Sequence, residues 1–165
     1  MTTKIVRATA ELWVFPLSGP TGGSGITAVD VIVVDIEASD GTTGTGFSYV
    51  LGGGGRTVRG ATQDMLDRYV ADQDVVPPQA LWRRLAGSLN RLGRGVGYLA
   101  IAAIDVAMWD LYAKQLGMPL YRALGGESRT LPVYGSGGFG PAQDPEAAVA
   151  RALEYADMGC TAIKL

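Results

Sequence analysis

Residues 98–119 read YLAIAAIDVAMWDLYAKQLGMP, and they indicate the centre of the fold more strongly than any other part of the sequence. The first half of this stretch is apolar apart from Asp105. An apolar run of this length and periodicity predicts an α-helix over Tyr98–Leu116 that is buried on nearly all sides. Gly117 and Pro119 follow it, and both are typical of a helix C-terminus. Such a helix requires other elements around it, so the chain is expected to form a hydrophobic core.

The residues before this helix predict a three-stranded antiparallel meander followed by two further helices. The expected strands are rich in β-branched residues or alternate in polarity, and they are Ile5–Leu17 (ending at Pro16), Val29–Ala38 and Thr42–Val50. Asp40-Gly41 is a typical hairpin turn between the last two strands. Two glycine-rich loops are expected at Ser18–Thr27 and Gly52–Gly55. The helices are expected over Arg56–Val70 and from Pro77-Pro78 through Leu89.

After Leu124-Gly125-Gly126 the pattern changes to strand, helix and strand. The expected order is a strand at Thr130–Tyr134, a loop at Gly135–Gly140, a helix from Asp144-Pro145 to Met158, and a strand at Thr161–Leu165. A β-α-β unit of this kind implies parallel pairing. We therefore expect one domain over residues 1–125 and a second, incomplete one over 126–165. A two-stranded parallel sheet with one covering helix is not expected to be stable alone, so the sequence is predicted to be part of a longer chain.

Composition excludes several classes of function. The 165 residues include 14 basic and 16 acidic side chains without a basic stripe, which argues against a nucleic-acid or acidic-membrane partner. The absence of histidine excludes Ser-His-Asp or Cys-His catalysis and an imidazole-ligated zinc site within this sequence. The single cysteine, Cys160, cannot form an internal disulfide, and no secretory leader is evident, so a cytoplasmic location is expected.

The predicted helix Tyr98–Leu116 and the residues after it resemble a segment of a known family. Ala102–Leu111, followed by Ala113-Lys114, Gly117–Leu120 and Leu124–Gly126, is similar to the signature of the mandelate racemase and muconate lactonizing enzymes of the enolase superfamily. The resemblance implies an α+β capping domain followed by the start of a (β/α) TIM-type barrel. It also implies abstraction of the proton α to a carboxylate through an enediolate, as in racemases, sugar-acid dehydratases and cycloisomerases. A small-molecule carboxylate substrate, Mg²⁺ held by ligands downstream of residue 165, and a homo-oligomer are further implications.

The same resemblance suggests site residues. Gly159–Leu165 (GCTAIKL) is similar to the second barrel strand, in which Lys164 would be the first lysine of a Lys-x-Lys motif. Lys164 would lie near the substrate carboxylate and lower the pKa of a base at position 166 by like-charge repulsion. Ser136 would donate a hydrogen bond to that carboxylate. The capping-domain loops would supply substrate contacts from Ile26, Tyr49, Val50 and Leu51.

Each of these assignments has a simpler alternative. Lys164 could be a strand-end lysine that extends to solvent, Ser136 a turn residue, and the loops ordinary surface segments. Asp105 and Asp110 invite a functional role, but structural pairing with Arg or Lys is the favoured interpretation.

Two other functions fit parts of the sequence. Gly135–Gly140 matches the G-x-G-x-x-G fingerprint, so a dinucleotide-binding βαβ domain of an oxidoreductase is one alternative. Pro141 and Asp144-Pro145 delay the following helix and place an acid at its start, which weighs against phosphate binding. The other alternative is a non-catalytic fragment or pseudoenzyme.

Overall fold

The computed structural model describes residues 3–21, 25–140 and 143–164. In chain order, the elements are β1 (Ile5–Thr21), β2 (Ile26–Ala38), β3 (Thr43–Leu51), α1 (Gly55–Tyr69), α2 (Pro78–Leu92), α3 (Arg94–Gln115), α4 (Leu120–Ala123), β4 (Tyr134–Ser136), α5 (Pro145–Asp157) and β5 (Ala162–Lys164). The chain divides into one unit of residues 1–19 and 26–127 and a second of residues 128–165 with the segment 20–25.

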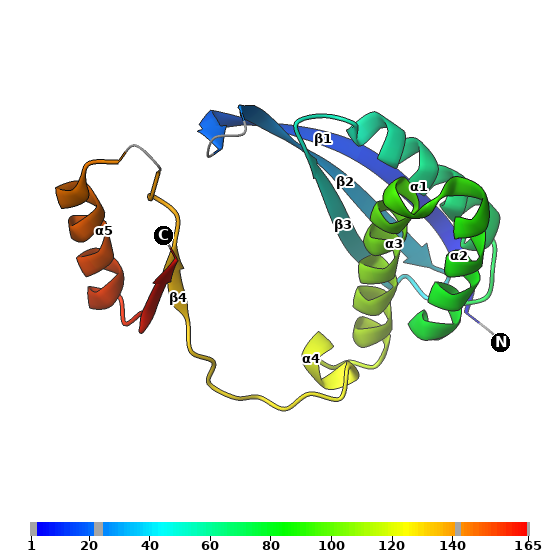
Figure 1. Ribbon diagram of the computed structural model, residues 1–165. Helices are drawn as coiled ribbons and strands as arrows, with labels where there is room; N and C mark the ends of the chain where they lie inside the picture. Colours follow the sequence, from blue (N-terminus) through cyan, green and yellow to red (C-terminus); the bar gives the residue numbers. More distant parts are fainter. Residues whose placement is uncertain (1–2, 22–24, 141–142, 165) are drawn as a thin grey trace. The chain divides into compact units, whose positions relative to one another are not determined.

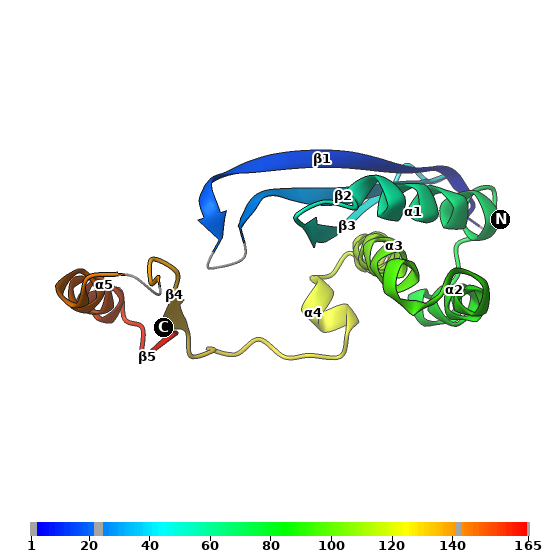
Figure 2. The same ribbon diagram turned by 45° about the horizontal axis from the view of Figure 1, so that its top comes forward.

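The first unit is a sheet with strand order β1-β2-β3 whose one face is covered by helices. Figures 1 and 2 show α1, α2 and α3 on the same side of the three strands. Antiparallel pairing of β2 and β3 runs without interruption from Val29↔Leu51 to Glu37↔Thr43. Alternate residues of β2 face the helices, and Ile32, Val34 and Ile36 are almost completely buried. The predicted α+β meander with helices is confirmed.

The hairpin between β1 and β2 differs from the prediction. β1 continues through Pro16 as far as Thr21, and β2 begins at Ile26, so most of the predicted loop Ser18–Thr27 is strand. Residues 22–24 of that loop lie outside the described part of the chain. The physical reason is the position of β1 at the edge of the sheet. Proline lacks an N–H but is tolerated where that group would face away from a partner strand.

Helix α3 is the centre of the core but is less buried than predicted. It begins at Arg94 rather than Tyr98, and its buried side chains include Ile104, Met108 and Leu111. Tyr98 is 46 % exposed and Val106 40 % exposed, so one stripe of the helix is open. The helix is long and apolar enough to cross a membrane. The central helix of a folded protein can be equally long and apolar. The extensive packing of α3 on β3, α1 and α2 is that of such a core helix.

Two glycines allow α3 to approach β3 closely. A Cβ atom at Gly44 would collide with the backbone oxygen of Ala107 and lie 2.7 Å from Leu111 N. A Cβ atom at Gly46 would collide with the Ala103 carbonyl oxygen and the Ala107 amide nitrogen. These contacts are with helix backbone, which a side-chain rotation cannot relieve. Glycine at both positions is therefore a packing requirement.

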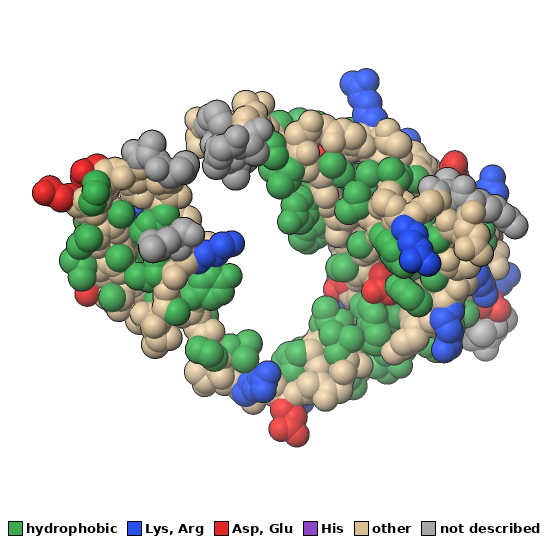
Figure 3. Space-filling view, in the orientation of Figure 1, with side chains coloured by type: hydrophobic (Ala, Val, Ile, Leu, Met, Phe, Trp, Pro, Cys, Tyr) green, Lys and Arg blue, Asp and Glu red, His purple; other side chains and the backbone are tan. Residues whose placement is uncertain are grey.

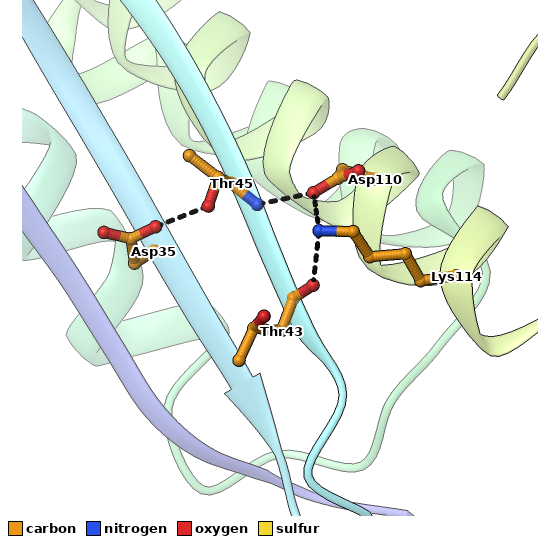
Figure 4. A network of polar contacts seen from close by, with 5 residues as sticks. All are labelled: Asp35, Thr43, Thr45, Asp110 and Lys114. Carbon is orange, nitrogen blue, oxygen red and sulfur yellow. Dashed lines mark hydrogen bonds and ion pairs between the residues drawn. The ribbon is translucent and has the colours of Figure 1, made fainter. Parts of the chain in front are cut away.

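Polar side chains of α3 then hold the outer edge of β3 (Figure 4). The Thr45 amide donates to Asp110 Oδ2 at 2.9 Å, and Lys114 Nζ donates to the Thr43 carbonyl oxygen at 3.0 Å. Lys114 and Asp110 also form an ion pair at 2.7 Å. Asp35, on β2, accepts a hydrogen bond from the Thr45 hydroxyl at 2.6 Å. The predicted structural pairing of Asp110 is confirmed.

The second unit contains a two-stranded parallel sheet and one helix. β4 pairs with β5 over three positions, Tyr134↔Ala162, Gly135↔Ile163 and Ser136↔Lys164. The parallel pairing and the helix between the strands are confirmed. The first strand was predicted at Thr130–Tyr134 and was placed too early, since its ladder is limited to residues opposite the short β5. Leu165, the predicted end of β5, lies outside the described residues.

Candidate functional site

The predicted catalytic residue Lys164 and the predicted substrate-binding residue Ser136 lie opposite each other at the ends of β5 and β4. Ser136 is the last residue of β4, Lys164 is the last of β5, and they are register partners. Neighbouring strands in a sheet are about 4.8 Å apart, and parallel partners direct their side chains to the same face. Both residues are exposed. Carboxyl ends of parallel strands are where enzymes built on such units bind their ligands.

The identity of Gly135 shows which face of the small sheet carries Ser136 and Lys164. A Cβ atom at Gly135 would collide with Tyr155 Cγ of α5, so this residue faces the helix. Side chains alternate along a strand. Tyr134 and Ser136 therefore point away from α5, as does Lys164, the partner of Ser136. A hydroxyl and an ammonium group together on the face opposite the helix can bind a carboxylate.

The turn after β4 is built by two glycines and a tyrosine. Gly137 and Gly138 have φ values of 97° and 76°, the left-handed region that favours glycine. The Tyr155 hydroxyl donates to the carbonyl oxygens of Ser136, at 2.7 Å, and Gly137, at 3.2 Å. The ring centroids of Tyr155 and Phe139 are 6.2 Å apart. This arrangement fixes the backbone on both sides of Ser136.

The geometry of the glycine-rich segment does not match dinucleotide binding. Gly135, the first glycine of the fingerprint, lies within β4, and α5 begins only at Pro145. Asp144 caps α5 by accepting a hydrogen bond from the Ala147 amide at 3.2 Å. The Asp144 carboxylate therefore accepts a helix N-terminal N–H that a bound phosphate would need. Its negative charge would also repel a phosphate. Pro141, which also entered the prediction, lies outside the described residues. The helix start therefore argues against the oxidoreductase alternative.

The predicted substrate-contact residues of the first unit lie at the end of β3 and the start of β2. Tyr49 and Leu51 are 55 % and 48 % exposed, on the sheet face opposite the helices. Val50, between them, is half-buried and packs against the core, so its side chain lies on the other face. Ile26 Cγ1 lies 3.5 Å from the Cβ position of Gly52, directly after β3. Their contacts with a substrate stay predictions.

A groove of about 570 Å³ borders the end of β3. Its lining residues come from β3 and α3: Phe47, Ser48, Tyr49, Val50, Leu51, Leu99 and Ala102. Ser48 is 6 % exposed, and its Oγ has no hydrogen-bond partner among the described residues. Sequence reasoning did not single out this residue. The available signal was a polar side chain on the apolar face of β3 that also carries Gly44 and Gly46.

Asp105 of α3 lies in a separate cavity between α2 and α3. The cavity measures about 320 Å³ and is lined by Gln79, Trp82, Arg83, Asp105 and Trp109. Burial raises the pKa of the half-buried Asp105 carboxyl above its ordinary value. Asp105 has no ion-pair or hydrogen-bond partner within the described part of the chain, so its predicted structural pairing is not found there.

The described residues do not provide a magnesium site. No three Asp, Glu, His or Cys side chains among them are grouped so that they could hold a metal ion. Magnesium in proteins is bound through carboxylate oxygens, and Ser136 and Lys164 offer none. No metal-binding role is therefore assigned to the residues of this chain.

Comparison with known proteins identifies the family. Residues 6–125 match the family model of the mandelate racemase/muconate lactonizing enzyme N-terminal domain. The chain belongs to this family. The predicted resemblance to the mandelate racemase and muconate lactonizing enzymes is confirmed. The matched residues cover nearly all of the meander and the helices α1, α2, α3 and α4.

Curated relatives within the mandelate racemase/muconate lactonizing enzyme family are enzymes that act on sugar acids or related compounds. The chain is 33 % identical over 138 residues to the 3,6-anhydro-α-L-galactonate cycloisomerase of Streptomyces coelicolor, covering 81 % of this chain and 38 % of the relative. It is 34 % identical over 119 residues to the L-talarate/galactarate dehydratase of Salmonella typhimurium, covering 69 % and 29 %. The chain thus spans less than half the length of these relatives.

Solved structures of family members match the fold over nearly the whole chain. The Salmonella typhimurium dehydratase, liganded with Mg and L-lyxarohydroxamate, has a TM-score of 0.89 at 25 % identity over 99 % of this chain and 44 % of its own. A racemase from Streptomyces coelicolor with bound magnesium has a TM-score of 0.84 at 30 % identity, covering 96 % and 45 %. The family therefore includes members solved with magnesium, and Mg²⁺ is expected for it.

Proposed function

We propose that the full-length protein abstracts the proton α to the carboxylate of a sugar acid or related α-substituted acid, forming an enediolate. Racemisation, dehydration and cycloisomerisation all begin with this step. The observation that carries the proposal is the Ser136↔Lys164 pair at the carboxyl end of β4 and β5, on the face away from α5. The named activities of the dehydratase and cycloisomerase relatives support the substrate class.

The proposed role of Lys164 follows from its charge. An α-proton next to a carboxylate is very weakly acidic, because removing it places a second negative charge on the molecule. Fixed positive charge beside the developing enediolate lowers that cost. We propose that the Lys164 ammonium group supplies such charge next to the substrate carboxylate, and that the Ser136 hydroxyl donates a hydrogen bond to the same carboxylate.

The support for magnesium comes from related proteins that were solved with this ion. We propose that the full-length protein requires Mg²⁺ held by residues outside positions 1–165, since the described residues contain no suitable ligand group. A bound divalent ion would supply further positive charge to the substrate oxygens.

Isotope exchange tests the proposal directly. The full-length protein is incubated in D₂O with Mg²⁺ and a panel of acids that includes galactarate, L-talarate, L-rhamnonate and arabinonate. We expect at least one acid to exchange its α-hydrogen or to be converted, as observed by ¹H NMR. No exchange or conversion of any acid would contradict the proposal.

Substitution of Lys164 provides the residue-level test. Lys164→Met should lower the exchange rate by roughly 10²- to 10³-fold, the effect of removing one group that stabilises transition-state charge. Lys4→Met is the matched control, because it removes the same charge from an exposed position in the first unit. Equal exchange rates for the wild type and Lys164→Met would contradict the role proposed for Lys164.

A further inference from the structure

Tyr155 on α5 touches the backbone on both sides of Ser136. Its ring occupies the space in front of Gly135, with Cδ2 2.5 Å from the position of a Gly135 Cβ atom. Its hydroxyl donates to the carbonyl oxygens of Ser136 and Gly137. A hydroxyl has a single proton, so the two acceptors share it. One side chain therefore connects to three successive residues at the end of β4.

The glycines around Ser136 make room for the contact between Tyr155 and the end of β4. Gly135 is not in the left-handed region, so its backbone would accept another residue. Glycine is needed there because any side chain would overlap the Tyr155 ring. Gly137 and Gly138 then turn the chain with positive φ values. Among the described residues, β4 pairs with β5 over three positions, and the contacts of Tyr155 add to this short ladder at the strand end.

We propose that Tyr155 is a positioning residue, which holds the backbone of residues 135–137 so that the Ser136 side chain stays beside Lys164. This inference rests on the proposed function, because it assumes that Ser136 and Lys164 bind the substrate carboxylate. Tyr155 itself does not touch substrate, since it packs on the α5 face of the strands and Ser136 points to the opposite face.

The hydroxyl and the ring of Tyr155 can be tested separately. In the full-length protein, Tyr155→Phe keeps the ring against Gly135 and Phe139 and removes only the two hydrogen bonds. We expect KM for the exchanging acid to rise about tenfold, the effect of losing one good hydrogen bond. We expect kcat to change by less than about twofold, because the groups that move the proton are unaltered. A mainly structural role predicts the reverse, a loss of active protein and lower kcat at unchanged KM.

Two controls and a second variant sharpen the result. Tyr112→Phe removes a hydroxyl that makes no hydrogen bond among the described residues and should leave KM unchanged. Gly135→Ala displaces the Tyr155 ring and should raise KM as Tyr155→Phe does. Gly140→Ala, on the same loop, places a methyl group where the structure describes no other atom within 4 Å, and it should leave KM unchanged. An unchanged KM in both Tyr155→Phe and Gly135→Ala would overturn the proposal.

A binding measurement separates this inference from the proposed function. Glycolate, a small α-hydroxy acid, is titrated into the ¹⁵N-labelled full-length protein, and the amide signals of residues 135–137 are followed. We expect saturable shifts in the wild type and about tenfold weaker binding in Tyr155→Phe. If no acid is turned over but these shifts occur, only the proposed function fails. If Tyr155→Phe binds glycolate as tightly as the wild type, the role of Tyr155 fails.

Discussion

Gly46 illustrates how strongly a single residue can control the packing of this fold. The Cβ position of Gly46 collides with backbone atoms of Ala103 and Ala107, so Gly46→Ala must push α3 away from β3. We expect a loss of about 2–3 kcal/mol in the free energy of unfolding, in the range for overpacked cores. Gly60→Ala is the control, because this helical glycine has open space around it and should gain about 0.5–1 kcal/mol. Urea unfolding measures both, and an unchanged stability in Gly46→Ala would show that the helix can move freely.

Asp105 should make stability depend on pH. Burial raises the pKa of its carboxyl above the ordinary value of 3.8, so the folded state binds the proton more tightly than the unfolded chain. The ionised carboxylate therefore destabilises the fold at pH values above the folded-state pKa. This penalty decreases as the pH falls through that pKa and is gone below the pKa of the unfolded chain.

Asp105→Asn tests this dependence. The variant should have a higher urea midpoint than the wild type at pH 7, and the difference should vanish near pH 3. Asp64→Asn changes the net charge equally at an exposed position of α1 and so controls for overall charge. A lower midpoint for Asp105→Asn at pH 7 would show that the carboxylate has a stabilising partner.

Which residues could be predicted from the sequence depends on the kind of information each one carries. Lys164 was found through resemblance within the predicted second strand and Ser136 in the loop just past the predicted first strand, and the structure makes them register partners. Tyr155 could not be found in this way. Its role depends on contact between a helix and a strand end, and a tyrosine on an amphipathic helix gives no sequence signal for that contact. Val50 was grouped with Tyr49 and Leu51, although strict alternation along β3 places it on the opposite face.

At the scale of elements, the edge of β3 is secured by α3. Asp110 accepts hydrogen bonds from the Thr45 amide and the Lys114 ammonium group. Asp110→Ala therefore leaves the edge N–H of Thr45 without its acceptor, while Lys114 keeps its bond to the Thr43 carbonyl oxygen. We expect Asp110→Ala to lower the free energy of unfolding by about 1–2 kcal/mol. Hydrogen bonds to a charged group are strong, but solvent partly screens this site. Lys114→Ala should lower the free energy of unfolding by less, at most about 1 kcal/mol.

The double-mutant cycle between these two residues distinguishes their contributions. We expect a coupling energy of roughly 0.5 kcal/mol that falls at 1 M NaCl, because salt screens the ion pair. The remaining cost of Asp110→Ala should be insensitive to salt, since it reflects the lost acceptor of the Thr45 amide. A coupling of zero at low salt would show that the ion pair contributes nothing, and that the separate hydrogen bonds of Asp110 and Lys114 to β3 secure the edge.

The elements themselves could largely be predicted, and the errors have a common cause. Periodicity indicated α1, α2, α3 and the meander, because their buried residues recur at the spacing of a helix or a strand, whereas α5 was indicated by its Asp144-Pro145 start. The end of β1 was placed too early because Pro16 was interpreted as a strand terminator. Its acceptability depends on β1 being an edge strand, which is a property of the whole sheet. The open stripe of α3 was missed for the same reason, since apolar composition does not show which faces have neighbours.

At the scale of the whole molecule, the two units differ in how much core they contain. The first unit has a continuous cluster of buried residues from the sheet and α1, α2 and α3. In the second unit, α5 has no buried residue. Val149 and Leu153 are exposed on it, and Met158 is exposed directly after its end. Figure 3 shows hydrophobic side chains over the surface of α5. Exposed apolar helix faces of this kind cost stability unless another element covers them.

Hydrogen exchange should reveal this difference. In a polypeptide of residues 1–165, amides of β2 and α3 should be protected to the level of global unfolding, whereas β4, α5 and β5 should exchange almost as fast as an unfolded chain. In the full-length protein, α5 should gain protection of at least about 10²-fold, because the family members of known structure are more than twice as long as this chain. Mass spectrometry of peptides from α3 and α5 measures both, with α3 as the internal standard. Strong protection of α5 in the polypeptide of residues 1–165 would show that the second unit is stabilised by contacts within this sequence.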